Sequence, residues 1–225
     1  MKVKAIASLI ALSTLTMSAQ PSTVVPEIVL TKANHAELVS EVTSFSVNDV
    51  IVKLRSMDKS KPRYLFIDSP GGEVQTGLRL VNFLQSSEGK GVVCVANVAI
   101  SMAFVSMQAC ETRIVTPNAV MMSHGISGGM RGYIQNIEAE LALMKGLDYI
   151  LAKVQAIRMG ITVEQLRKLQ NPEYWIVGSD DIIKANAADS VQRVTCGEDM
   201  LVPVVTKELQ EDGKEIEVTK IACPL

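Results

Sequence analysis

The segment Arg63–Gly72, RYLFIDSPGG, indicates the fold class more clearly than any other part of the sequence. Its first half, Arg63–Ile67, is a short apolar run bounded by turn residues, which is typical of a buried strand. Its second half ends in Gly71 and Gly72, and helical spacing begins soon afterwards at Thr76–Gln85. A buried strand that passes through a glycine turn into a helix is the repeating unit of α/β proteins.

Strand–loop–helix units continue in both directions, as far as about Val191. Short apolar runs predict the strands, and apolar residues three and four apart predict the helices. The predicted strands are Glu27–Thr31, Gly91–Ala96, Arg113–Val115 and Ala119–Met122, and the predicted helices are Ala36–Arg55, Ser101–Ala109, about Tyr133–Ala156 and two short ones opening at Thr162 and Ser179. The chain is therefore expected to form an α/β fold with a mainly parallel sheet.

A polar extension follows this region. Val202–Thr206 and Glu215–Lys220 alternate in polarity around the turn Glu211–Lys214, which predicts a β-hairpin. We expect a main domain over residues 20–191 and a C-terminal extension over residues 192–225.

Composition excludes several function classes. The 225 residues are 48% hydrophobic and 20% charged, so the chain is not a disordered one. The net charge is −2, no basic run stands out, and aromatic residues make up only 4%. Nucleic-acid binding is not expected, because it requires clustered positive charge or stacking aromatic side chains.

The N-terminus has the pattern of a secretory signal peptide over residues 1–19. Lys2 and Lys4 precede the uncharged run Ala5–Met17, and the small residues Ser18 and Ala19 follow it. A buried N-terminal helix is the alternative. With a signal peptide, the mature protein would be periplasmic or secreted in a bacterial-type cell, with no stable membrane insertion after signal removal.

The four cysteines are Cys94, Cys110, Cys196 and Cys223. None forms a CxxC pair, so no zinc or dithiol redox site is indicated. Disulfides fit a secreted protein, and three pairings are possible in principle. Cys94 and Cys110 lie among apolar residues, where ordinary buried thiols are expected. Cys196 and Cys223 flank the predicted hairpin and are the favoured pair.

Few residues are candidates for chemistry. His35 lies in a polar stretch and is expected on the surface, whereas His124 follows a predicted strand and precedes glycines. Strand ends that face loops are where α/β proteins place catalytic groups. Ser101 begins a predicted helix, either as an ordinary N-cap or as a nucleophile beside free N–H groups. The Gly71–Gly72 pair is either a simple turn or a place where backbone approaches a ligand.

Three short stretches taken together are far more specific than any one of them. Ile67–Gly72, Ala99–Ala103 and Met121–Gly125 carry SPGG, ISMA and MSHG in this order, before a long helix. This pattern resembles the Clp protease proteolytic subunit family over about Glu27–Val191. The resemblance implies a fold shared with ClpP and the crotonases, built of repeated β-β-α units with a long handle helix.

The resemblance also implies the roles of individual residues. Ser101 matches the nucleophile, and His124 matches the general base. The backbone N–H groups of Met102 and of Gly71 or Gly72 match the oxyanion hole.

The third member of the triad departs from the family. Glu173, two residues before Trp175 and sixteen before Asp189, stands where the family has an aspartate. It is expected to complete the triad, although it is one methylene longer, and a Ser–His dyad is the alternative. Asp180 and Asp181 compete for the role but fit the first turn of a helix.

The implied function is that of a serine endopeptidase acting on peptides or unfolded polypeptides. A secreted enzyme has no ATP to use and the chain has no Walker motif, so neither ATP nor any cofactor or metal is expected. The family implies a homo-oligomer, a ring or stacked rings joined by Gly128, Gly129 and the helix from Tyr133. The family's His-Gln-Pro becomes His124-Gly125-Ile126 here, so contacts with the substrate after the base are expected to differ.

Three rival functions remain at this point. A Ser/Lys protease related to signal-peptide peptidases shares the fold but does not need His124. A crotonase-type acyl-CoA enzyme would use the same oxyanion hole. A catalytically inactive scaffold or binding module would retain the fold alone.

Overall fold

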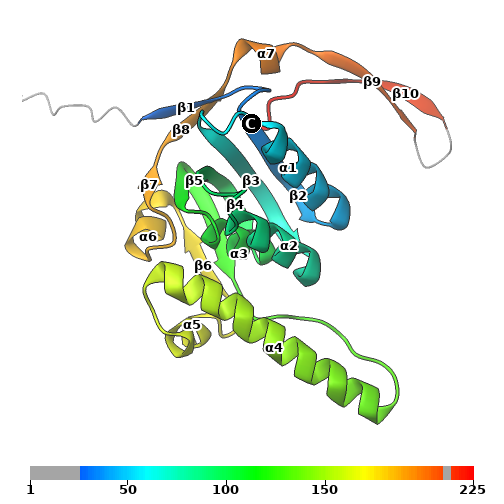
Figure 1. The fold of residues 1–225 in the computed structure, drawn as a ribbon, viewed down its shortest axis with the longest axis vertical. Helices are drawn as coiled ribbons and strands as arrows, with labels where there is room; N and C mark the ends of the chain where they lie inside the picture. The colour runs from blue at the N-terminus through cyan, green and yellow to red at the C-terminus, as the bar shows by residue number, and fades with distance from the viewer. Residues whose placement is uncertain (1–25, 210–213) are drawn as a thin grey trace, which may run out of the picture.

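The computed structural model describes residues 26–209 and 214–225. Its centre is a six-stranded sheet in the order β2-β3-β4-β5-β6, with β7 also paired to β5 (Figure 1). The strands are β2 (His35–Val42), β3 (Arg63–Gly72), β4 (Val92–Ile100), β5 (Thr112–Ser123), β6 (Tyr174–Val177) and β7 (Ser190–Val191). Within this sheet only β6 runs antiparallel to its neighbour, so the expected α/β fold with a mainly parallel sheet is confirmed.

Both faces of the sheet are covered. The helices are α1 (Ser44–Ser56), α2 (Val74–Leu84), α3 (Met102–Gln108), α4 (Ile134–Met159), α5 (Val163–Leu169), α6 (Ser179–Lys184) and α7 (Glu198–Leu201). In β3, Leu65 and Ile67 face the helix-covered core, whereas Phe66 between them faces a second cluster. The second cluster is formed with β1 (Glu27–Leu30), β8 (Arg193–Cys196) and Met200 of α7. This alternation explains why β3 is apolar at consecutive positions.

The parallel strands share an irregularity at one level. The register shifts between Ile67 and Asp68 where β3 meets β4, and between Ala96 and Val98 where β4 meets β5. The side chain of Asn97 fills this level, since it donates to Asp68 (3.3 Å) and accepts from Thr116 (3.0 Å). Beyond the bulges, β3, β4 and β5 all end at the same edge of the sheet, where the candidate site lies.

The predicted helix Ala36–Arg55 is wrong in its first half. His35–Val42 is strand β2, which pairs in parallel with β3 and buries Leu38 and Val42. The helix begins only after Thr43, which forms a capping box with Ser46. The apolar spacing across this junction fits a helix locally, but pairing with β3 decides the outcome.

The two strands predicted around Pro117–Asn118 are one continuous strand, β5. Ala96 of β4 pairs with Val115 and Val98 pairs with Val120, so residues 116–119 of β5 lie opposite the single residue Asn97 and form a bulge. The turn residues therefore mark an irregular segment rather than the end of a strand.

Several local predictions are confirmed. Thr162 and Gln165 form the expected capping box, α4 covers the predicted long helix, and Asp180 and Asp181 lie in the first turn of α6. The antiparallel hairpin consists of β9 (Val204–Leu209) and β10 (Glu215–Lys220). The predicted turn at Glu211–Gly213 and the predicted signal peptide lie outside the described residues. No helix in the part of the chain that the structure describes is both long and apolar enough to cross a bilayer.

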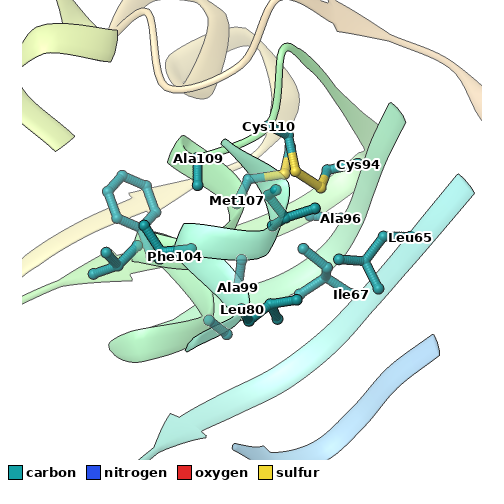
Figure 2. Packing of buried hydrophobic residues seen from close by; sticks show 14 of the residues in the cluster. Leu65, Ile67, Leu80, Cys94, Ala96, Ala99, Phe104, Met107, Ala109 and Cys110 are labelled. Atoms are coloured by element: carbon teal, nitrogen blue, oxygen red, sulfur yellow. A yellow bond between two sulfur atoms is a disulfide. The ribbon is translucent and has the colours of Figure 1, made fainter. Parts of the chain in front are cut away.

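Two disulfides link the four cysteines. The favoured Cys196–Cys223 bridge is present and ties the segment after the hairpin to β8. The expectation of buried free thiols at Cys94 and Cys110 is wrong, because these residues form a second bridge. Helix α3 runs back over β4 and brings the two Cα atoms to 6.0 Å, within bridging distance. Figure 2 shows this bridge packed in the core beside Ala96 and Met107.

Candidate active site

Ser101 lies in a sharp turn between β4 and α3. Its φ of 56° and ψ of −122° are rare for a residue other than glycine. Although Ser101 occupies the N-cap position, its side chain makes no capping hydrogen bond. The hydroxyl oxygen instead lies 2.7 Å from Nε2 of His124. The ordinary N-cap explanation of this serine therefore fails, because the hydroxyl is used elsewhere.

The pairing of β4 with β5 brings Ser101 and His124 together. The two strands are parallel neighbours, Ile100 pairs with Met122, and the Ser101 N–H donates to the Met122 carbonyl at 2.9 Å. His124 directly follows the end of β5, so its imidazole reaches the same edge. The ring is half-buried. A neutral imidazole protonated on Nδ1 can accept a hydrogen bond from the serine hydroxyl through Nε2, which is the arrangement that a general base needs.

The end of β3 completes this edge with backbone. Gly71 has a φ of +93°, and a Cβ placed there would lie 2.8 Å from the backbone nitrogen of Met102. Met102 is the first residue of α3, so its N–H has no partner within the helix. The Gly71 N–H donates to Ser69 Oγ at 3.2 Å, and Gly72 lines the cavity beside the serine. The Met102 N–H and the Gly72 backbone therefore lie next to the hydroxyl, at a position where backbone N–H groups could donate to an oxyanion.

A small cavity of about 60 Å³ opens beside the hydroxyl and the imidazole. Its other walls are mainly apolar and are formed by Gly72, Val74, Met102, Val105, Gly125, Ile126, Ser127 and Leu151. A groove of about 520 Å³ between α2 and α4 shares Val74, Ile126 and Ser127 with this cavity. The cavity and the groove therefore share one wall, so the groove adjoins the space beside the hydroxyl.

Glu173 is not joined to this pair. It lies on the surface before β6, and its carboxylate accepts a hydrogen bond from Nε1 of Trp175 at 2.8 Å. Within residues 26–209 and 214–225, no hydrogen bond links the His124 ring to a carboxylate. The structure therefore brings together Ser101, His124 and the two-glycine turn and leaves the expected third residue apart.

The prediction that His35 lies on the surface is wrong. Its side chain is buried, with Nδ1 2.6 Å from the Thr31 carbonyl and Nε2 3.8 Å from Glu37. As the first residue of β2, it lies at the opposite edge of the parallel sheet from His124. The polar neighbours in sequence concealed a strand position that tertiary packing covers.

One group of residues beside His124 escaped the sequence analysis. Ser123, Gln155 and Gln170 are buried and hydrogen-bonded to one another, and Arg167 and Asp148 extend the network. The available signal was Gln155, a polar residue one step after Val154 in the apolar pattern of α4. No cluster of three or more metal-ligating side chains occurs in the described part of the chain.

The family of the chain follows from comparison with known proteins. A model of the Clp protease family matches residues 22–191, which include the whole of the site just described. The chain belongs to the Clp protease family. Its fold and peptidase class are those of this family, so it is a hydrolase related to the Clp proteolytic subunits.

Two relatives show how distant this Clp protease homologue is from curated members. The ATP-dependent Clp protease proteolytic subunit of Streptococcus equi subsp. equi (strain 4047) is 30% identical over 152 residues, which cover 64% of this chain and 78% of that protein. The ATP-dependent Clp protease proteolytic subunit 2 of Tropheryma whipplei (strain Twist) is 25% identical over 138 residues, or 59% of this chain and 77% of that protein.

Proposed function

We propose that this protein is a serine endopeptidase that hydrolyses peptides or unfolded polypeptides without ATP. The observation that carries the proposal is the 2.7 Å contact between Ser101 Oγ and His124 Nε2. Ser101 itself lies in a strained turn, with a positive φ. Strain at a single non-glycine residue is typical of functional positions, because a merely structural turn would recruit glycine.

The proposed mechanism is acyl transfer. His124 removes the hydroxyl proton as Ser101 attacks the peptide carbonyl, and a covalent acyl-enzyme forms as the amine leaves with that proton. The N–H groups of Met102 and of Gly71 or Gly72 donate to the oxyanion. Water then attacks the ester, again with His124 as the base, and releases Ser101.

We further propose that Glu173 orients the imidazole in the working enzyme. Its carboxylate is exposed and held only by the Trp175 indole, so a side-chain rotation has little packing to overcome. A carboxylate on Nδ1 of His124 would fix the tautomer and stabilise the imidazolium. If Glu173 stays with Trp175, catalysis proceeds through a Ser–His dyad.

The proposed location is the periplasm or the exterior of the cell, after removal of residues 1–19. Both disulfides support this location, since such bonds persist in oxidising compartments. ATP is absent there, which is the basis for assigning peptides and already unfolded chains as substrates. Residues 20–191 would form the peptidase domain and residues 192–225 an extension tied back by Cys196–Cys223.

We propose a homo-oligomer in which α4 joins subunits. The buried residues of this 26-residue helix, Leu151, Ala152, Gln155, Ala156 and Met159, all lie in its second half. Its first half extends past the rest of the fold (Figure 1). Leu141 and Leu143 in this half are exposed. Apolar side chains on a projecting helix are expected to be covered by another subunit.

The test is active-site labelling of protein expressed from about Gln20 with a fluorophosphonate, and mass spectrometry to locate the adduct. Wild type is expected to be modified at Ser101, with labelling abolished in Ser101→Ala and His124→Ala. Glu173→Ala is compared with Asp180→Ala, a nearby carboxylate in the first turn of α6. Weaker labelling in the former alone supports the triad, and equal labelling supports the dyad.

The same experiment separates the rivals. Labelling that survives His124→Ala but requires a lysine would indicate a Ser/Lys protease. Wild-type protein that assembles but is never labelled would support an inactive scaffold and overturn the proposed function.

A further inference from the structure

The chain segment that carries His124 is held on both sides by hydrogen bonds. Before the histidine, the amide of Gln170 donates to Ser123 Oγ at 2.6 Å, and also to the main-chain carbonyl of His124 at 3.4 Å. After it, the N–H of Ile126 donates to the carboxylate of Asp148 at 2.8 Å. Gln170 follows α5 and Asp148 belongs to α4, so two separate elements grip this segment.

Arg167 joins the two grips. Its Nη1 donates to Oε1 of Gln170 at 2.9 Å, and its Nη2 donates to the main-chain carbonyl of Asp148 at 2.8 Å and to the carboxylate of the same residue. A continuous series of hydrogen bonds therefore runs from the Ser123 side chain through Gln170, Arg167 and Asp148 to the main chain of Ile126. A guanidinium suits this role, because its planar fork can serve two acceptors in fixed directions.

The central residues of this hydrogen-bond network are buried. Ser123, Gln155 and Gln170 are at most 6% exposed. Ser123 donates to Oε1 of Gln155, whose amide donates to the Leu151 carbonyl at 2.9 Å, so each of these side chains is satisfied. Buried polar networks whose members are all satisfied rigidify their surroundings. None of these residues contacts the imidazole ring or the Ser101 hydroxyl by a hydrogen bond that the structure contains.

We propose that Arg167 is a positioning residue for the general base. It closes the loop of hydrogen bonds around His124 and thereby holds the imidazole at the distance that proton transfer from Ser101 needs. The proposal rests on the proposed peptidase function.

Two observations give this role physical weight. The residues after Ser123 form an extended loop that belongs to neither a helix nor a strand, so the backbone alone does not fix the ring. The carboxylate expected to orient the imidazole, Glu173, is bound to Trp175 in this structure. As long as Glu173 stays with Trp175, the position of the imidazole depends on its own main chain, which Gln170, Asp148 and Arg167 restrain. Displacing a catalytic group by about 1 Å lowers rates by about 100-fold.

The test compares Arg167→Met, Arg167→Lys and Lys168→Met. Lys168 is the adjacent exposed cation on α5, paired only with Glu164, so its loss is a matched control for charge and helix. The rate of fluorophosphonate reaction at Ser101 is measured over a range of probe concentrations, which separates probe binding from the chemical step. We expect Arg167→Met to slow the chemical step by roughly 100-fold with binding changed less than threefold. Arg167→Lys should recover part of the rate, and Lys168→Met should stay within about twofold of wild type.

A spectroscopic readout separates positioning from a general loss of stability. The chain has two histidines, His35 and His124, which lie at opposite edges of the sheet. In protein labelled with ¹³C-histidine, Arg167→Met should shift or broaden the His124 ring signal and leave that of His35 unchanged. If Arg167→Met does not fold, Gln170→Met removes the other end of the same link and should give the same pattern.

Failure of the two proposals can be distinguished. Wild type that is not labelled at Ser101 would contradict the peptidase function. The His124 signal would still show whether Arg167 restrains the imidazole. Folded Arg167→Met with the wild-type labelling rate and an unmoved His124 signal would overturn the role proposed for Arg167.

Discussion

Gly71 and Ser101 approach so closely that a Cβ on the glycine would lie 2.7 Å from the Cβ of the serine. Atoms of this kind do not approach to such a distance, and the φ of Gly71, +93°, is strained for any side chain. Position 71 at the end of β3 therefore has to be glycine if the sharp turn at Ser101 is to keep its conformation.

Gly71→Ala is expected to lower labelling of Ser101 by at least about 100-fold, because either the serine or the backbone donors must move. The folded state should also lose about 1–2 kcal/mol from the left-handed conformation alone. The labelling rate and chemical denaturation measure the two effects. Gly91→Ala is the control, since Gly91 also has a positive φ, +78°, but a Cβ there meets nothing within 4 Å; it should lose similar stability and keep the labelling rate.

The Cys94–Cys110 bridge closes a loop that contains Ser101, with a sequence separation of 16. Replacing both cysteines with alanine should lower the free energy of unfolding by about 3 kcal/mol, the entropic effect expected for a loop of this length. Urea denaturation measures the loss. Wild-type stability in the double variant would contradict a structural role for this bridge.

The second bridge should behave differently. Cys196→Ala with Cys223→Ala frees the C-terminal segment, whereas β4 and α3 remain linked. We expect limited proteolysis between residues 197 and 222 to become faster while Ser101 keeps its labelling rate. Loss of labelling would instead mean that the extension supports the site.

Asp189 links pH to stability through Arg113. Burial raises the pKa of this carboxyl, but hydrogen bonds from the Arg113 side chain and backbone, with the charges of Arg113 and Arg158, leave the pKa below its ordinary value. A depressed pKa gives stability that is present above the ordinary value, near pH 4, and is lost as the pH falls through the lower folded value.

Asp189→Asn should therefore destabilise the protein at pH 7 and have less effect as the pH falls below about 4. Because Asp189 is 37% exposed, we expect a loss of about 1–2 kcal/mol rather than the larger cost of breaking a fully buried pair. Thermal unfolding between pH 3 and pH 7 measures it. Asp49→Asn, in an exposed pair with Lys53, should change stability by at most about 0.5 kcal/mol at any pH.

The projecting half of α4 predicts an effect on assembly. Leu143 is 54% exposed, and an aspartate there should shift the protein to smaller species in light scattering, because a charge would be buried at the subunit contact. Lys145→Glu, an exposed charge reversal on the same helix, is the control. An unchanged molar mass in Leu143→Asp would contradict the assignment of this surface.

The site was predictable wherever sequence neighbours define it. SPGG, the serine after β4 and the histidine after β5 are each short local signals, and parallel pairing must bring the ends of adjacent strands together. The third member of the triad was harder to predict from sequence. Spacing from Trp175 selects the position of Glu173, but it cannot tell whether the carboxylate turns toward His124 or toward the indole beside it.

The errors arose where distant contacts override local patterns. His35–Val42 has apolar spacing compatible with a helix, yet its pairing with β3 makes it a strand. Cys94 and Cys110 look like ordinary buried residues until α3 folds back over β4. The hydrogen-bond network around His124 joins residues up to 47 positions apart. Gln155 in a long helix does not reveal from sequence that it binds Ser123.

The ends of β3, β4 and β5 supply the glycine turn, the serine and the histidine, one part each. A growing polypeptide that has folded only the first two of these strands has a hydroxyl without its base. Hydrolytic power would thus arise only once the third strand has been added to the sheet. In the proposed peptidase, a chain that is still being synthesised would therefore be unable to cut itself or its neighbours while they are unfolded.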